Sequence, residues 1–420
     1  MNDWNDLHLD REILPLFDYT LNPHAKSRVM EMLHKPLGSL EAIQSRQGIL
    51  KGFIQNHALL KGYSYTVYYV EEVLAFTRNE KIEEPGTKKL RYTLFTPKHE
   101  KVRYRSRFHQ LILFFHRLES VYFSRLNTAV FPSFYKAELK TITGVLSRFR
   151  LAYFEPLVRE NRIKNAHILE LIALIGELRN SGEIERFWEA LFRFEAFLSI
   201  SKGIQKQRFV FPEIGGQGIA LEAFFHPSLE QPIKNSLETS QNVLVINGAN
   251  MSGKSTLLKA IGLCVYLGHT GLAVPASRAR LQLFTNFTID INRRDDIQNG
   301  YSHFMCEVMS LKAVLEEAST GKAGLAIFDE LFSGTNVEDG FQICKTTLEG
   351  LGQFKNSLFI ISTHIQELKT VCAPHISPYH IDCTLENEQP TFTYQLKEGW
   401  SDVKVGQLLF EKEGLNDLLA

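Results

Sequence analysis

The sequence has few cysteines, no long apolar run and no excess of charge of either sign. Its five cysteines are an odd number in 420 residues, are widely scattered and include no CxxC pair. That pattern excludes a disulfide framework and a zinc site of the usual spacing, and it is typical of a reducing compartment. The cysteines are Cys264, Cys306, Cys344, Cys372 and Cys383.

The sequence also has little that would direct it to a membrane. The N-terminal residues MNDWNDLHLDRE are polar and acidic, which is unlike a signal peptide. The longest apolar stretches, such as residues 111–115, are far shorter than a membrane span. We therefore expect a cytoplasmic protein with no membrane partner.

Lysine plus arginine equals aspartate plus glutamate at 47 each, so the whole chain has no electrostatic preference for nucleic acid. One local stretch, Lys88 to Arg125, is nevertheless basic, with Tyr92, Tyr104 and Phe108 interleaved. Such a stretch either contacts DNA phosphates or forms a solvated helix face, and the sequence leaves both readings open. Its basic residues are Lys88, Lys89, Arg91, Lys98, Lys101, Arg103, Arg105, Arg107, Arg117 and Arg125.

The two halves of the chain differ in glycine content and in the spacing of their apolar residues. Residues 1–205 contain few glycines and carry apolar residues at three- and four-residue spacing, which predicts an all-α domain. Residues 206–420 instead contain short apolar runs that lead into polar residues and then into helical patterns. Three of these runs, at 243–246, 324–328 and 358–361, predict buried parallel strands. The second half is therefore predicted to be an α/β domain with a parallel-rich sheet flanked by helices.

A glycine-rich motif follows the first predicted strand. VLVINGANMSGKSTLLKAIGL places Gly248 five residues before Gly253, Lys254 and Ser255, between a strand and a helix, which is the context of a P-loop. Backbone N–H groups of such a loop bind phosphate oxygens, Lys254 would reach the β- and γ-phosphates, and Ser255 would bind Mg²⁺. The predicted ATP-binding residues are Gly248, Ala249, Asn250, Met251, Ser252, Gly253, Lys254, Ser255 and Thr256.

Polar residues also follow the other two predicted strands. Asp329 would hold Mg²⁺ and Glu330 would orient or deprotonate the attacking water. His364 follows the third strand and is predicted to sense the γ-phosphate, because its position directs it to the same edge of the sheet. Between the glycine-rich motif and the second predicted strand, Ser302 fits a helix N-cap, and from the segment alone it is equally an ordinary cap or an anion site.

Taken in this order, the motifs resemble the ATPase domain of the MutS family, a branch of the ABC-type ATPases. The resemblance in the second half of the chain rests on four motifs, GANMSGKSTLLK, DDIQNGYSHFMCE, FDELFSGTN and STHIQEL. It also extends to the first half. There the segment LNPHAKSRVMEMLHKPLGSLEAIQSRQGIL is similar to the start of the MutS core, or lever, domain. It implies a helical core domain followed by an ABC-type P-loop ATPase domain. It further implies a homodimer with composite sites, in which Ser302 of one subunit completes the ATP site of the other.

The sequence departs from the family pattern in several places. It begins at the core domain, so we expect no mismatch-reading domain, no full DNA clamp and no nuclease-like domain after Ala420. Phe332 and Ser333 stand where the family usually has glycine and then arginine or lysine. The Phe187-Trp188-Glu189 triplet has the letters of a mismatch-reading wedge, but its helical context favours packing.

Two functions remain open on the sequence. The first is a MutS-like ATPase that hydrolyses ATP across a dimer interface to drive a conformational switch in DNA binding and repair. The alternative is a nucleotide-driven dimer switch that acts on a protein partner without binding DNA. A small-molecule kinase shares the P-loop, but the Asp329-Glu330 pair, His364 and the helix after Ser302 favour hydrolysis.

Overall fold

The computed structural model describes residues 4–78, 98–249, 252–291, 303–332, 335–371, 373–386 and 389–401, with residues 410 and 418. Among the described residues, no helix combines the length and apolar composition that crossing a bilayer requires. The four described cysteines, Cys264, Cys306, Cys344 and Cys383, are free, as the sequence predicts.

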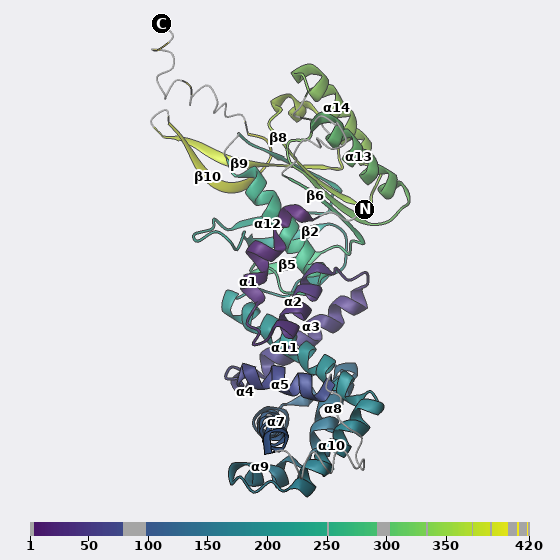
Figure 1. The fold of residues 1–420 in the computed structure, drawn as a ribbon. Helices are drawn as coiled ribbons and strands as arrows, with labels where there is room; N and C mark the ends of the chain where they lie inside the picture. Colours follow the sequence, from purple (N-terminus) through teal and green to yellow (C-terminus); the bar gives the residue numbers. More distant parts are fainter. Residues whose placement is uncertain are drawn as a thin grey trace. The chain divides into compact units, whose positions relative to one another are not determined.

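Helices occupy most of the first half of the chain (Figure 1). They are η1 (Asn5–Leu7), η2 (Leu9–Ile13), α1 (Leu14–Phe17), α2 (Pro23–His34), α3 (Leu40–Gln55), α4 (His57–Leu60), α5 (Val67–Arg78), α7 (Lys98–Arg117), η3 (Leu118–Phe123), η4 (Thr128–Val130), α8 (Ser133–Arg148), α9 (Leu151–Arg159), α10 (Asn165–Asn180) and α11 (Glu183–Gln207).

Strands and helices alternate in the second half. The strands are β1 (Glu213–Ile214), β2 (Ile219–Phe224), β3 (Asn235–Thr239), β4 (Val243–Asn247), β5 (Arg278–Leu281), β6 (Asn286–Asp290), β7 (Gly324–Phe328), β8 (Leu358–Thr363), β9 (Ile376–Glu386) and β10 (Gln389–Glu398). The helices are α12 (Lys254–His269), α13 (His303–Ser319), α14 (Val337–Leu351) and η5 (Gln366–Thr370). All three strands predicted from apolar runs are confirmed, as β4, β7 and β8.

The chain divides into two compact units. One contains Met1–Leu16, Met32–Gln47 and Gln207–Ala420, and the other contains Phe17–Glu31 and Gly48–Lys206. The predicted domains, 1–205 and 206–420, differ from these units in the placement of residues 1–16 and 32–47. Those two segments lie with the sheets, where Arg46, for example, donates a 2.6 Å hydrogen bond to the carbonyl of Thr270.

A six-stranded sheet organises the first unit, in the order β10-β9-β4-β8-β7-β6. Its strands pair in parallel except for β10, which is antiparallel to β9. A second sheet has the order β1-β5-β2-β3. Because β4, β8 and β7 are parallel neighbours, the residues that follow their carboxyl ends are brought to one edge of the six-stranded sheet.

Both faces of the six-stranded sheet are covered. Since side chains alternate along a strand, Val243, Val245 and their neighbours face a core built with Leu311 of α13 and Leu348 of α14. On the other side Ile327 lies against Gly262 of α12. Figure 1 shows α12 on the face opposite α13 and α14. Helix α12, which follows the predicted P-loop, therefore packs on a face of the sheet different from the one that α13 and α14 cover.

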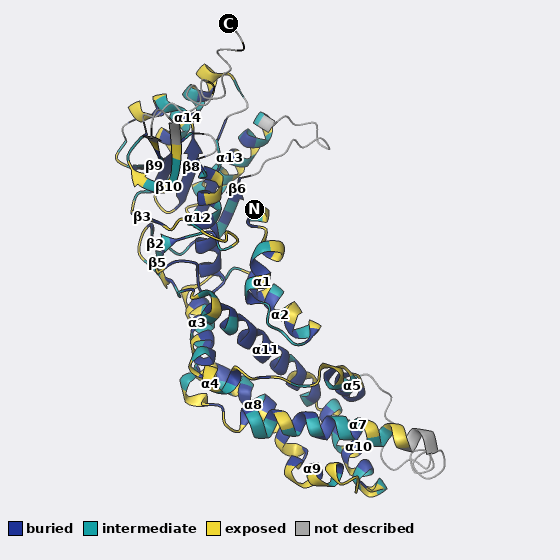
Figure 2. Cartoon of the chain, turned by 90° about the vertical axis from the view of Figure 1, so that its left-hand side faces the viewer, coloured by how far each residue is buried: buried dark blue, intermediate teal, exposed yellow. Residues whose placement is uncertain are grey.

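Every regular element among the described residues of the second unit is a helix, and α11 is buried along most of its length (Figure 2). Phe187 and Trp188 are fully buried in this helix, and the indole Nε1 donates a 2.9 Å hydrogen bond to Thr77 Oγ1. This confirms the prediction that the Phe-Trp-Glu triplet serves packing. Apolar residues at the predicted three- and four-residue spacing are also buried in α10, where they are Ile168, Leu171, Ile175 and Leu178.

Candidate functional site

The predicted P-loop joins the end of β4 to the start of α12. Gly253 has φ +93°, a left-handed conformation that favours glycine, and it directly precedes the helix. A Cβ atom on Gly248 would lie 2.9 Å from Ser252 Oγ, so a larger residue at this position would displace the Ser252 hydroxyl. Asn250, Met251 and Ser302 lie outside the described residues.

Lys254 extends back along the loop instead of out to solvent. Its Nζ donates hydrogen bonds to the carbonyls of Gly248 at 2.9 Å and Ala249 at 3.1 Å. The same ammonium lies 3.0 Å from Glu330 Oε1, and its side chain is only 4% exposed. Desolvation makes a buried ammonium costly unless it is paired, so the loop carbonyls and Glu330 together stabilise the charge at this point.

Asp329 links the P-loop helix to two strands. Ser255 Oγ, at the start of α12, donates to Asp329 Oδ2, and Ser362 Oγ, near the end of β8, donates to Asp329 Oδ1. The Asp329 backbone N–H donates to the Asp290 carbonyl at the end of β6. The two carboxylate oxygens are therefore oriented by hydroxyl groups from different elements. Ser362 was not predicted, although it stands two residues before His364.

Glu330 occupies a backbone conformation that non-glycine residues seldom adopt, with φ +51°. Its N–H donates a 2.9 Å hydrogen bond to Ser362 Oγ, which helps to hold this turn. One carboxylate oxygen faces Lys254, and the other lies 3.7 Å from His364 Nδ1. The structure therefore brings Lys254, Ser255, Asp329, Glu330 and His364 into one cluster.

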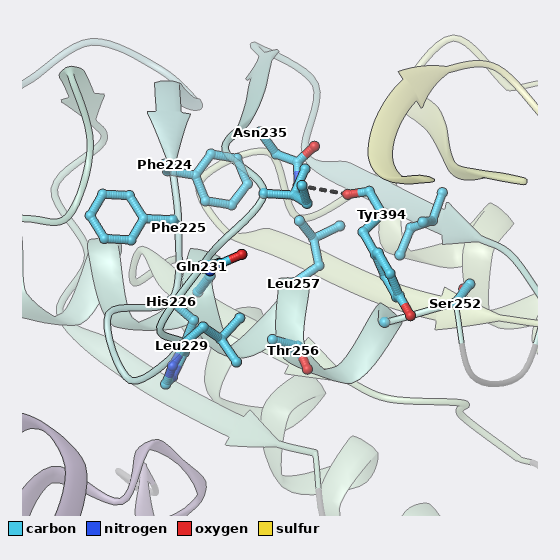
Figure 3. A pocket seen from close by; sticks show the side chains of 14 residues that line it. Phe224, Phe225, His226, Leu229, Gln231, Asn235, Ser252, Thr256, Leu257 and Tyr394 are labelled. Atoms are coloured by element: carbon cyan, nitrogen blue, oxygen red, sulfur yellow. Dashed lines mark hydrogen bonds between the residues drawn. The ribbon is translucent and has the colours of Figure 1, made fainter. Parts of the chain in front are cut away.

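A pocket of about 290 Å³ opens beside the P-loop (Figure 3). Ser252, Gly253 and Thr256 form one side of it. Most of the other lining side chains are apolar or aromatic, including Phe225, Leu229, Ile233 and Tyr394. These residues were not predicted as site residues, because they come from the segment between β2 and β3 and from β10, away from the glycine-rich motif.

Tyr394 is held over the P-loop by an irregular strand. The register of β10 shifts between Phe392 and Leu396, and Tyr394 has φ +56°. Asn235 holds this bulge, because its Nδ2 donates to the Tyr394 carbonyl at 3.0 Å and its Oδ1 accepts from the Leu396 N–H at 2.8 Å (Figure 3). As a result the ring of Tyr394 lies against Gly253, where an added Cβ would come within 3.1 Å of it.

These residues fit a nucleoside triphosphate with a divalent cation. Ser252 Oγ and both side-chain atoms of Asn247 are buried without hydrogen-bond partners, so the start of the loop offers unused polar groups. The first N–H groups of α12 have no intrahelical acceptor, and the helix dipole favours an anion there. Ser255 and Asp329 offer oxygen ligands of the kind that Mg²⁺ prefers.

No group of three or more His, Cys, Asp or Glu side chains is placed to hold a metal within the part of the chain that the structure describes. A magnesium ion at Ser255 and Asp329 would therefore depend on water and phosphate oxygens for its other ligands, as is usual for this ion.

The basic stretch is described only in part. Lys88, Lys89 and Arg91 lie outside the described residues. Arg105 donates to the Ile163 carbonyl, Arg107 lies over the ring of Phe76, and Arg117 donates to Ser64. Phe108 is fully buried and Tyr104 packs against Phe76. Several members of this stretch thus have partners inside the helical unit.

Comparison with known proteins supports the resemblance drawn from the motifs. Residues 244–415 match the family model described as MutS domain V. The chain is 31% identical over 212 residues to the DNA mismatch repair protein MutS of Natronomonas pharaonis, an alignment that covers 49% of this chain and 24% of that protein. It is 28% identical over 228 residues to the protein of the same name from Lysinibacillus sphaericus, covering 52% and 26%.

A longer alignment, to the DNA mismatch repair protein MutS of Leuconostoc citreum, is 29% identical over 286 residues and covers 64% of this chain and 33% of that protein. The chain thus spans about a quarter to a third of the length of these curated relatives. These comparisons confirm the resemblance to the MutS family, which is established over residues 244–415, the part of the chain that matches MutS domain V.

Proposed function

We propose that this protein binds and hydrolyses ATP at the cluster that follows β4, β7 and β8, within an ABC-type P-loop fold. The observation that carries the proposal is the convergence of Lys254, Ser255, Asp329 and Glu330 at the carboxyl ends of neighbouring parallel strands. An isolated Asp-Glu pair carries little information. A pair joined to a P-loop lysine and serine has the parts that phosphoryl transfer to water requires.

Each residue of the cluster has a separate proposed role. Lys254 binds the β- and γ-phosphates, and Glu330 orients the attacking water and accepts its proton. His364 contacts the γ-phosphate from the far side of Glu330. Ser255 and Asp329 hold Mg²⁺, which when bound would neutralise charge that develops on the phosphate oxygens.

The pocket beside the loop is the proposed site for the adenine base. Base pockets in proteins are mostly apolar with a few polar groups, as this one is. Its wall begins at Ser252 and Gly253, so a nucleotide with its phosphates on the P-loop would direct its base there. The aromatic ring of Tyr394 offers a stacking surface at that point.

We propose that the protein acts as a homodimer with composite ATP sites, one subunit supplying Ser302. Helix α13, which follows Ser302, exposes Met305 and Met309, and α14 exposes Val337 at its start. Exposed apolar side chains at these positions suit a protein interface. ATP binding would close the dimer as a conformational switch. The mismatch-repair names of the relatives suggest a role in DNA binding and repair.

Measured ATP turnover tests the catalytic proposal. Lys254→Ala and Glu330→Gln are each expected to lower turnover by about 10² to 10⁴-fold, the range that general-base and phosphate-binding groups supply. Lys355→Ala, which removes an exposed lysine between α14 and β8, is the matched control and should retain wild-type turnover. Wild-type activity in either site variant, with the fold intact by circular dichroism, would refute the assignment.

DNA distinguishes the two switch hypotheses. If the protein acts on DNA, duplex or branched DNA should change ATP turnover, and the effect should fade as salt rises from 50 to 200 mM, because counterion release drives phosphate contacts. Turnover that DNA leaves unchanged at about 50 mM salt would instead favour a protein partner.

A further inference from the structure

The N-terminal segment of residues 4–16 packs on the elements that build the proposed ATP site. The Trp4 ring lies 5.2 Å from that of Tyr266 on α12, and Leu7 lies beside Gly262 of the same helix. Asp6 Oδ2 accepts a 2.7 Å hydrogen bond from the Ile291 N–H, just after β6. This segment therefore contacts the P-loop helix directly, although most of the chain separates the two in sequence.

A further contact runs from this segment to the wall of the pocket. Ser228 Oγ donates a 2.9 Å hydrogen bond to Glu12 Oε2, and the same hydroxyl lies 2.6 Å from His226 Nδ1. His226 is buried and lines the pocket beside the P-loop (Figure 3). Glu12, Ser228 and His226 thus form a continuous chain of hydrogen bonds that ends at the pocket.

The direction of these hydrogen bonds follows from the donors available. A carboxylate only accepts, so the single hydroxyl hydrogen of Ser228 goes to Glu12. Ser228 Oγ must then accept from His226, which places a hydrogen on Nδ1. Burial lowers the pKa of His226, an effect that Glu12 opposes and that Lys259 and His8 reinforce, so the ring is neutral near pH 7. Glu12 therefore selects one tautomer and one orientation of this imidazole.

We propose that Glu12 is a positioning residue for the nucleotide base, acting through Ser228 to hold His226 in the wall of the base pocket. The inference rests on the proposed ATP-binding function and adds a residue that no motif contains. It gives the N-terminal segment a part in nucleotide recognition that is separate from phosphate binding, because Lys254 and Ser255 are not among the residues that line the pocket.

The test compares a ligand that has a base with one that has none. Binding of ATP and of inorganic tripolyphosphate, both with Mg²⁺, is measured by calorimetry on the full chain. Tripolyphosphate contacts only the phosphate subsite, so Glu12→Ala should weaken ATP binding by about five- to tenfold, the usual effect of losing one hydrogen bond. It should leave tripolyphosphate binding within about twofold, since the P-loop is unchanged.

Two variants serve as controls. Asp10→Ala removes a carboxylate of the same segment that contacts His34 instead of the pocket, and it should bind both ligands as wild type does. Glu12→Gln keeps a side-chain oxygen that accepts the hydrogen bond from Ser228, so this variant should bind ATP with wild-type affinity. Ser228→Ala breaks the same chain from the pocket side and should reproduce the selective loss, which keeps the test valid if Glu12→Ala does not fold.

The outcomes separate this inference from the function on which it rests. Unchanged ATP affinity in Ser228→Ala, or an equal loss for ATP and tripolyphosphate, would overturn the positioning role and leave the ATP site standing. Wild-type protein that binds neither ligand would overturn the ATP site itself, and the positioning role with it.

Discussion

At the scale of single residues, the ion pair between Lys254 and Glu330 occupies the lysine of the proposed phosphate site. The ammonium is already bound by two loop carbonyls and by the carboxylate, 3.0 Å away. A nucleotide phosphate must compete with Glu330 for the same cation. The pair is mostly shielded from water, so that competition carries a real free-energy cost.

Glu330→Gln should therefore bind ADP more tightly than wild type does. The amide keeps the shape of the side chain but removes the negative charge that competes with the phosphates for Lys254. We expect the dissociation constant for ADP to fall about fivefold, equivalent to roughly 1 kcal/mol. Calorimetry with ADP measures this without interference from hydrolysis, and weaker ADP binding in the variant would contradict the competition.

Phe332 illustrates a departure from the family pattern that the structure explains in part. The family usually has glycine at this position, and Phe332 keeps the left-handed backbone that glycine favours, with φ +63°. Its ring is buried and lies 5.9 Å from that of Phe304 at the start of α13. Burial of an aromatic ring of this size offsets the backbone strain of a left-handed residue.

The core of the site was predictable from sequence because its residues follow strand ends or belong to a motif. Asp329 directly follows an apolar run, His364 stands three residues after another, and Lys254 belongs to the glycine-rich motif that follows a third. Parallel pairing of the strands brings the three residues together. Tyr394 and Asn235 were not predictable, since their placement depends on a register shift in β10. A bulge of this kind leaves no clear pattern in the residues themselves.

At the scale of elements, His269 at the end of α12 makes the stability of the sheet-containing unit depend on pH. Burial lowers the pKa of His269 to about 4, and its Nε2 accepts a hydrogen bond from the Phe284 N–H. Between about pH 6.5 and 4 the unfolded chain binds a proton that the folded chain does not. The stability contributed by His269 is therefore present above pH 6.5 and is lost as the pH falls towards 4.

We predict that protection of α12 amides from hydrogen exchange, corrected for intrinsic rates, decreases by up to about 3 kcal/mol between pH 6.5 and 4. His269→Gln retains an acceptor for the Phe284 N–H but cannot titrate, so its protection should depend less on pH. Equal pH dependence in the two proteins would exclude His269 as the cause.

Glu195 on α11 should give the helical unit the opposite pH dependence. Burial raises the pKa of Glu195 to about 7, although the hydroxyls of Tyr65 and Tyr63 and the amide of Asn22 donate hydrogen bonds to it. Between about pH 4.5 and 7 the folded chain holds a proton that the unfolded chain releases. Stability of this unit therefore decreases as the pH rises through that range.

Hydrogen exchange of α11 amides tests this, with Glu195→Gln as the variant that keeps the size of the side chain and does not titrate. We expect protection in wild type to fall by about 1 to 3 kcal/mol from pH 5 to 7, and the variant to show a flatter profile. A rise in wild-type protection over this range would contradict the direction.

The elements themselves were predicted unevenly. Strands β4, β7 and β8 are buried on both faces, so they read as continuous apolar runs. The sheet of β1, β5, β2 and β3 was not predicted, because its strands are two to six residues long and alternate in burial. The placement of residues 1–16 with the sheets also could not be read from helical periodicity, which does not say what a helix packs against.

At the scale of the whole molecule, the proposed dimer depends on the apolar surface of α13. We predict that Met309→Glu weakens ATP-dependent self-association, because it places a charge among side chains that a partner subunit would bury. Val67→Glu is the matched control, since Val67 is exposed to the same degree in the helical unit. Sedimentation velocity with ATP measures both, and equal association of the two variants would argue against an interface at α13.

The proposed ATP site requires a bound triphosphate and its magnesium ion to meet at Ser255 and Asp329. The most direct test measures the dissociation constant for ATP by calorimetry on the Glu330→Gln protein, once with Mg²⁺ and once with a chelator. We expect Mg²⁺ to tighten ATP binding at least about tenfold, and Asp329→Asn in the same background to remove most of that gain. If Mg²⁺ raises ATP affinity by the same factor in the protein with Asp329 and in the protein with Asp329→Asn, then Asp329 does not hold the magnesium ion, and the proposed site is contradicted.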